Sequence, residues 1–220
     1  MTFALLIAAL AFAPQQSVHA AKSAANAQAV IQQAAADAAA GNLDTAEGDY
    51  TTALARSSDD ATLRVGYGDF LLTQHRYADA IAQFQLVLSR APHRLDAEVG
   101  LATAYRGARN FDEAKRILLA AHTEHPADAR PLTDLGDLEI EAQTYDAAIA
   151  HLKSAVAINP GDVGARERLV IAYKAKGDSA NALTQASAVI ARDPKNAIAY
   201  FTRAELYSDQ NKNALALKDA

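Results

Sequence analysis

Four of the six prolines recur at a constant interval, and this spacing constrains the fold more than any other feature of the sequence. Each of them follows the previous one by 34 residues: Pro92, Pro126, Pro160 and Pro194. Proline lacks the N–H group that a helix interior needs, so it commonly marks the end of a helix. Self-similarity at a fixed period of a few tens of residues is typical of repeat proteins. The sequence therefore predicts an array of equal units.

A frame that sets proline at position 32 of the repeat aligns the other columns. Position 20 is alanine throughout: Ala46, Ala80, Ala114, Ala148, Ala182 and Ala216. Position 8 is small with one exception: Ala34, Gly68, Ala102, Gly136, Val170 and Ala204. Position 24 is large with one exception: Tyr50, Phe84, Leu118, Leu152 and Ala186. The repeats span residues 27–60, 61–94, 95–128, 129–162 and 163–196, with a partial repeat at 197–220.

These columns have a simple physical explanation in a pair of antiparallel helices. The two helices approach closely only where side chains are small, at positions 8 and 20, and large side chains fill the space beside the crossing. A single pair of this length is marginal in water, and it buries its apolar face by stacking on the next pair. We therefore expect an all-α fold, an α-solenoid of stacked helix pairs. Val170 and Ala186 predict altered packing in the repeat 163–196.

Composition agrees with this class and excludes several others. The chain has 54 alanines among 220 residues, and alanine is the best helix former. Its net charge of −5 argues against a nucleic-acid partner, which usually requires a basic patch. The absence of cysteine excludes thiol catalysis and disulfides. No phosphate-binding loop, nucleophile elbow or zinc-protease motif is present, so we expect neither an enzyme nor a bound cofactor.

The first twenty residues have the pattern of a secretory signal peptide. Residues 3–13 form an uninterrupted apolar run, which is too short to span a bilayer. Val18 and Ala20 suit a signal peptidase that cleaves after Ala20. No lysine or arginine precedes the run, which points to a true start upstream or a misassigned start codon. A buried first helix or an uncleaved anchor is the alternative to a cleaved signal. We expect export to the periplasm or secretion, no membrane span after cleavage, and a linker at residues 21–26.

Turn and cap residues recur at the repeat boundaries. The segments between repeats supply residue types that cap helix N-termini: Ser58-Asp59-Asp60, Gly161-Asp162 and Lys195-Asn196. Within the repeats, short turns such as residues 41–44 and 143–146 separate the two helices, and the aliphatic or aromatic residue after each turn is expected to pack inward.

The period and the columns together resemble the tetratricopeptide repeat (TPR) family, whose repeat is 34 residues long. The resemblance covers residues 27–220, and one of the best matches to the family pattern is Leu135, Gly136, Tyr145, Ala148, Leu152 and Pro160. The chain departs from the pattern at position 11, where Asp37 and Glu139 replace the usual aromatic residue. The segment 27–60 has Ser58 in place of proline, so it is either a divergent repeat or a set of capping helices.

The resemblance implies a right-handed superhelix whose concave groove is lined by the first helix of each repeat. In this family the groove binds a peptide or a partner helix, without a chemical step. The charged and apolar residues that we expect to line the groove are Asp69, Leu72, Val99, Arg106, Asp137, Ile140, Glu141, Ile171, Lys174, Phe201 and Glu205. Acidic residues outnumber basic ones at these and the neighbouring groove positions, which favours an apolar partner with some basic residues. A solvated helix face is the alternative interpretation of the acids.

The histidines are weak candidates for a metal site. His122 and His125 lie three residues apart, but they fall at the end of an expected helix, where a cationic side chain is ordinary. His75, His93 and His151 are expected to face solvent. We therefore expect no metal.

Three functional hypotheses follow from the sequence. The first is a protein-binding scaffold in a bacterial cell-envelope assembly. The second is an accessory arm of a larger protein whose catalytic domain lies beyond residue 220. The third is self-association through the apolar C-terminal end, where no polar capping helix completes the last repeat. The unfinished repeat leads us to expect that the chain is a fragment.

Overall fold

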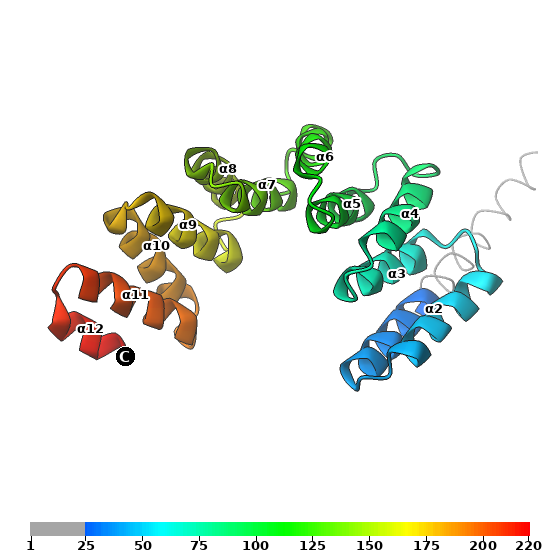
Figure 1. Cartoon of the computed structure of the whole chain (residues 1–220), viewed down its shortest axis with the longest axis horizontal. Helices are drawn as coiled ribbons and strands as arrows, with labels where there is room; N and C mark the ends of the chain where they lie inside the picture. Colours follow the sequence, from blue (N-terminus) through cyan, green and yellow to red (C-terminus); the bar gives the residue numbers. More distant parts are fainter. Residues whose placement is uncertain (1–24) are drawn as a thin grey trace, which may run out of the picture. The chain divides into compact units, whose positions relative to one another are not determined.

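The computed structural model describes residues 25–220, and the regular structure among them is entirely helical (Figure 1). Residues 25–39 form a helix that precedes the others. The remaining helices are α2 (Leu43–Arg56), α3 (Ala61–Thr73), α4 (Tyr77–Leu88), α5 (Leu95–Gly107), α6 (Phe111–Glu124), α7 (Arg130–Glu141), α8 (Tyr145–Ile158), α9 (Val163–Lys176), α10 (Ser179–Arg192), α11 (Ala197–Asp209) and α12 (Asn213–Asp219). The proposed signal peptide lies outside the described residues.

The chain divides into two compact units, and the boundary along the sequence falls after Ala108, in the turn between α5 and α6. Within each unit the helices pack in consecutive pairs, and each pair packs against the next. The contacts within repeats include α3 with α4, α7 with α8, and α9 with α10. Those between repeats include α4 with α5 and α8 with α9. The predicted α-solenoid of stacked helix pairs is confirmed.

The repeat boundaries follow the local chemistry of the sequence. Each of the four periodic prolines lies between two helices, as with Pro160 between α8 and α9. Three predicted caps are confirmed. Asp60 Oδ1 accepts a hydrogen bond from Leu63 N at 3.0 Å, Asp162 and Asn196 make the equivalent bonds at 2.9 Å, and each satisfies an N–H group that the helix cannot.

The turn within each repeat contains one residue with positive φ, always at position 15. Gly41 and Gly177 adopt φ values of 85° and 82°, where glycine meets no steric penalty. The other repeats place larger residues in the same left-handed conformation: His75, Arg109, Gln143 and Asn211. In the repeats other than 95–128, the next residue donates its N–H back into the first helix, as Arg76 N does to Leu71 O at 3.0 Å. This bond closes the helix end and turns the chain into the second helix.

The small columns are buried in the first five repeats, as the sequence predicts, whereas Ala204 and Ala216 in the last repeat are half-buried. The position-20 alanines of the first five repeats are 0% exposed: Ala46, Ala80, Ala114, Ala148 and Ala182. In the repeats 61–94 and 129–162, position 8 faces the large side chain at position 24. A Cβ atom on Gly136 would lie 2.4 Å from Leu152 Cγ, and one on Gly68 would lie 2.7 Å from the ring of Phe84. The small residue is therefore required by the large one.

Replacing Ala148 with leucine is expected to destabilise the protein by about 1–3 kcal/mol, because the added carbons enter a filled core. Ala148 lies in a cluster of buried side chains with Leu152 and Leu169. Thermal unfolding followed by circular dichroism measures the effect. The control is Ala150→Leu, an exposed position on the same helix, which should leave the melting temperature nearly unchanged. Equal melting temperatures for the two variants would contradict the buried position of Ala148.

Candidate functional site

The residues that we expect to line the groove all lie on the first helices of the repeats. In the first unit, Asp69 and Leu72 are on α3, and Val99 and Arg106 are on α5. The other predicted residues belong to the second unit, on α7, α9 and α11: Asp137, Ile140, Glu141, Ile171, Lys174, Phe201 and Glu205. Leu72, Val99 and Arg106 are half-buried. Ile140 is also half-buried, because it packs against the core beneath the helix surface.

Asp69 on α3 has an unusual electrostatic environment for an exposed residue. The surrounding protein partly desolvates its carboxyl group, and the nearby Asp96 on α5 repels its negative charge. Both effects disfavour the charged form, and they raise the pKa of Asp69 from 3.8 to about 6. Asp96 is itself held by Arg94, whose Nε donates to Asp96 Oδ1 at 2.8 Å. The first helices of adjacent repeats thus place two carboxylates close together.

We expect Asp69 to titrate above the usual range of aspartate, towards pH 6, in a carboxyl-carbon NMR titration. Because the folded-state pKa is higher than that of the unfolded chain, the folded state binds the proton more tightly. This residue therefore favours folding as the pH falls from about 6 to 3.8, and it opposes folding at neutral pH. Asp96→Asn should lower the pKa of Asp69. Titration of Asp69 at the ordinary value in both proteins would contradict the predicted environment.

Ion pairs join the successive first helices of the second unit. Arg168 Nε on α9 donates to Asp137 Oδ1 on α7 at 2.6 Å. Lys174 Nζ on α9 donates to Glu205 Oε2 on α11 at 2.7 Å, so two of the predicted groove residues bind each other directly. These pairs are at least partly exposed and contribute little to stability. They nevertheless neutralise part of the acidic character that the sequence suggests.

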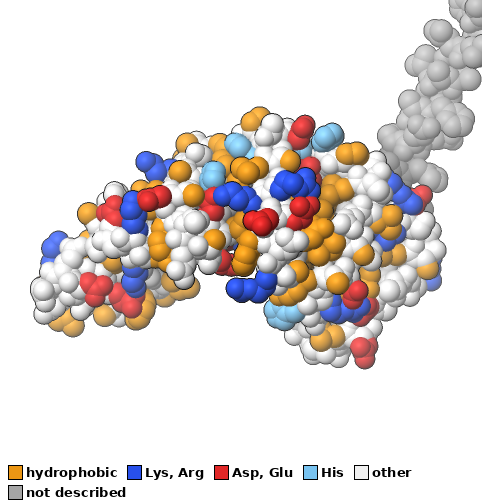
Figure 2. All heavy atoms as spheres, turned by 45° about the horizontal axis from the view of Figure 1, so that its top comes forward, with side chains coloured by type: hydrophobic (Ala, Val, Ile, Leu, Met, Phe, Trp, Pro, Cys, Tyr) orange, Lys and Arg blue, Asp and Glu red, His pale blue; other side chains and the backbone are white. Residues whose placement is uncertain are grey.

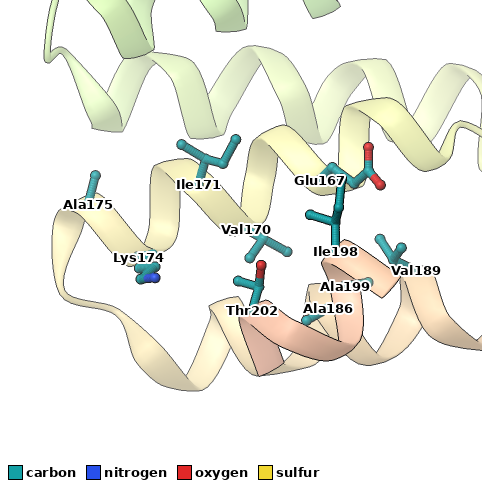
Figure 3. A pocket seen from close by; sticks show the side chains of 10 residues that line it. All are labelled: Glu167, Val170, Ile171, Lys174, Ala175, Ala186, Val189, Ile198, Ala199 and Thr202. Atoms are coloured by element: carbon teal, nitrogen blue, oxygen red, sulfur yellow. The ribbon is translucent and has the colours of Figure 1, made fainter. Parts of the chain in front are cut away.

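Large apolar side chains are exposed on α9 and α11. Ile171, Ile198 and Phe201 are 53%, 74% and 65% exposed, respectively. Ile171 and Ile198 line a cavity of about 500 Å³ between α9, α10 and α11, which also includes Lys174 (Figure 3). Phe201 and Glu205 line a second cavity of about 440 Å³ between α11 and α12. The structure therefore brings four predicted residues, Ile171, Lys174, Phe201 and Glu205, to two adjoining hollows.

Charged side chains of opposite sign are mixed on the surface. On the face that Figure 2 shows, acidic and basic side chains lie beside one another. None of the described helices combines the length and the apolar character that a membrane crossing requires.

A buried carboxylate in the second unit was not anticipated as an interacting group. Glu139 on α7 is 2% exposed, and its two oxygens have separate partners. Lys115 Nζ lies 3.1 Å from Oε1, and His151 Nδ1 lies 2.7 Å from Oε2. The expectation that His151 faces solvent is wrong, because this half-buried ring joins α8 to α7. The departure from the repeat pattern at position 11 was the sequence clue.

The arrangement of histidines and acids does not form a metal centre among the described residues. Within residues 25–220, no three histidine or acidic side chains lie close enough together to hold a metal ion. His122 and His125 lie at the end of α6, as expected.

Proteins built from stacked helix repeats generally act as non-catalytic scaffolds for protein–protein interaction. Solved structures with the same fold include a TPR protein from Parabacteroides merdae ATCC 43184, with 22% identity, a TM-score of 0.64, and coverage of 88% of this chain and 77% of that one. A thermophilic TPR protein of Thermus thermophilus has 21% identity, a TM-score of 0.70, and coverage of 83% and 99%.

A third structure is that of YrrB, described as a TPR protein with an unusual peptide-binding site. It has 22% identity and a TM-score of 0.56, and the match covers 77% of this chain and 88% of YrrB. No curated protein matches the sequence. Family models described as tetratricopeptide repeats match residues 31–94, 71–135 and 139–201. The chain therefore belongs to the tetratricopeptide repeat family.

Proposed function

We propose that this chain is a non-catalytic scaffold that binds a peptide or a partner helix on α7, α9 and α11. One observation carries the proposal. The exposed apolar side chains Ile171, Ile198 and Phe201 gather on α9 and α11, where cavities lie beside them. Soluble proteins rarely expose contiguous apolar surface without a binding role.

The charges around these residues favour a partner with basic residues. Lys174 and Glu205 neutralise each other. Glu167 accepts a hydrogen bond from the side-chain amide of Asn196 at 2.7 Å, which leaves its negative charge in place. The exposed Asp209 adds a second negative charge at the end of α11. An apolar segment that carries lysine or arginine would complement this surface.

The direct test uses peptides that are selected from a random display library for binding to the chain, and it measures their affinity for variants of the chain. The double variant Ile171→Ser/Phe201→Ser removes two exposed apolar side chains. We expect it to bind the selected peptides with an affinity lower by about tenfold or more. The matched control is Leu119→Ser on α6, which removes an exposed apolar side chain from a second helix of a repeat. Equal affinity of the double variant and the unaltered chain would place binding elsewhere and refute the proposal.

We also propose that the protein is exported and works in a bacterial cell-envelope assembly. The proposal rests on the apolar run and the cleavage pattern of residues 1–20. Residues 1–24 fused to an alkaline phosphatase that is active only outside the cytoplasm should yield activity, and the processed fusion should begin at Ala21. Deletion of residues 3–13 is the control. Activity that does not depend on this run, or an unprocessed N-terminus, would contradict the proposal.

Self-association through residues 197–220 remains a prediction of the sequence. Leu215 and Leu217 are exposed on α12, and Leu217 lines the cavity that α11 and α12 share. Sedimentation at increasing concentration separates a monomer from an assembly, and Leu217→Ser should abolish any assembly that uses this end.

A further inference from the structure

The repeat 163–196 reverses the sizes of two packing residues. Its position 8 is Val170, whereas the other repeats have alanine or glycine there, and its position 24 is Ala186, whereas the preceding repeats have tyrosine, phenylalanine or leucine. The large position-24 residues of those repeats are buried: Tyr50, Phe84, Leu118 and Leu152. The space that such a side chain fills must therefore be occupied differently in this repeat.

Phe84 shows what a large residue at this position does. Its ring fits between Gly68 on the first helix of its own repeat and Gly100 on the first helix of the next. A Cβ atom would lie 2.7 Å from a ring atom of Phe84 if it were added to Gly68, and 2.4 Å if it were added to Gly100. The side chain thus seals the junction of three helices, α3, α4 and α5.

The equivalent junction in the repeat 163–196 has no large position-24 side chain to seal it. Val170, Ala186 and Thr202 occupy the positions of Gly68, Phe84 and Gly100, and all three line the cavity of about 500 Å³ between α9, α10 and α11 (Figure 3). First helices contact each other closely in the pairs α3–α5 and α7–α9, whereas α9 and α11 make little backbone contact. Val170 and Ala186 are nearly closed off at the base of this cavity, at 5% and 1% exposed. The cavity therefore lies over the place where the preceding repeats have a large position-24 side chain.

The cavity opens on the surface proposed for partner binding. Its lining includes Ile171 and Ile198, which are exposed, and Lys174, which is paired with Glu205. Glu167 stands at the same opening with its charge retained beside the amide of Asn196. The interior is apolar, formed by residues such as Val170 and Val189. Apolar walls, an open mouth and one acidic group define the chemistry of an occupant.

We infer that this cavity, the Ala186 pocket, receives one leucine or phenylalanine side chain from a partner segment that carries lysine or arginine beside it. The inserted side chain takes the place that Phe84 fills within its own repeat. The neighbouring basic residue lies against Glu167. This inference rests on the proposed function and adds the specificity of the surface: one apolar anchor and a basic neighbour.

The decisive experiment fills the pocket from inside. Library-selected peptides on the unaltered chain are expected to share a leucine or phenylalanine next to a lysine or arginine. Ala186→Leu supplies the missing side chain. The affinity of these peptides for this variant should be lower by at least about tenfold, which corresponds to the burial of one large apolar side chain. Replacing the leucine or phenylalanine of the peptide with alanine should lower its affinity for the unaltered chain by a similar factor. The same replacement should change its affinity for Ala186→Leu little, because the two changes remove the same contact.

Matched variants separate the pocket from general effects on the fold. Thr202→Leu narrows the pocket from α11 and should weaken the same peptides, whereas Ala150→Leu, exposed on α8, should not. Melting temperatures of Ala186→Leu and Thr202→Leu at or above that of the unaltered chain would show that filling the pocket preserves the fold. Glu167→Gln should weaken binding a few-fold and reduce its sensitivity to salt.

The results distinguish this inference from the proposed function. Some peptides could require Ile171 and Phe201 for binding and yet bind Ala186→Leu and Thr202→Leu with unchanged affinity. That result would overturn the inference about the pocket and still support the proposed binding surface. Additive losses for the anchor and Ala186→Leu would also overturn it. Failure to select any peptide would overturn both.

Discussion

Replacing Phe84 with alanine is expected to lower the free energy of unfolding by about 3–5 kcal/mol. The ring is 0% exposed, and it fits between Gly68 and Gly100 on two different helices. Because both neighbours are glycines, neither can extend a side chain into the space left by the ring. The helices would have to move together to close the cavity, and the stacked repeats on either side oppose that movement. Urea unfolding followed by circular dichroism measures the loss.

The control for Phe84 lies two residues away. Leu86 is on the same helix, but its side chain is exposed, so Leu86→Ala should change the free energy of unfolding by about 0.5 kcal/mol or less. A loss for Phe84→Ala no larger than that for Leu86→Ala would contradict the packing of three helices around the ring.

Removing both partners of Glu139 is the second large effect. The double variant Lys115→Ala/His151→Ala leaves the buried carboxylate without the groups that lie 3.1 Å and 2.7 Å from its oxygens. Breaking a buried ion pair in this way costs about 3–5 kcal/mol, because the remaining charge is uncompensated. We expect a lower urea midpoint with an unchanged slope.

A third substitution tests the cause of that loss. Glu139→Leu in the double variant replaces the stranded charge with an apolar side chain, and it should recover more than half of the stability. Lys115→Ala alone should cost much less, because this lysine is partly exposed and His151 remains. If the triple variant were as unstable as the double variant, lost packing rather than the buried charge would be responsible.

The sequence was sufficient to predict the helix pairs, because their requirements are local and periodic. Proline spacing located the boundaries, cap residues such as Asp162 located helix starts, and the alanine column located the crossings. The close approach of the two helices at each crossing admits few residue types other than alanine and glycine. This explains why the residue pattern alone places Ala148 in the core.

Contacts between repeats were less predictable. The pairs Lys174–Glu205 and Arg168–Asp137 depend on how neighbouring helices are offset and on the rotamers of long side chains, and residue spacing does not specify either. Glu139 shows the same limit, since its partners come from α6 and α8. The cavity is an intermediate case. The sizes of Val170 and Ala186 indicated altered packing, but the sequence did not reveal an open hollow.

Hydrogen–deuterium exchange of the chain with and without a selected peptide tests the central claim most directly. Binding on the first helices predicts that the peptide slows amide exchange in α9 and α11, with a smaller effect in α7. Amide exchange in α8 should be unchanged. Protection confined to α8 and the exposed side of α10, with none in α9 or α11, would contradict the account.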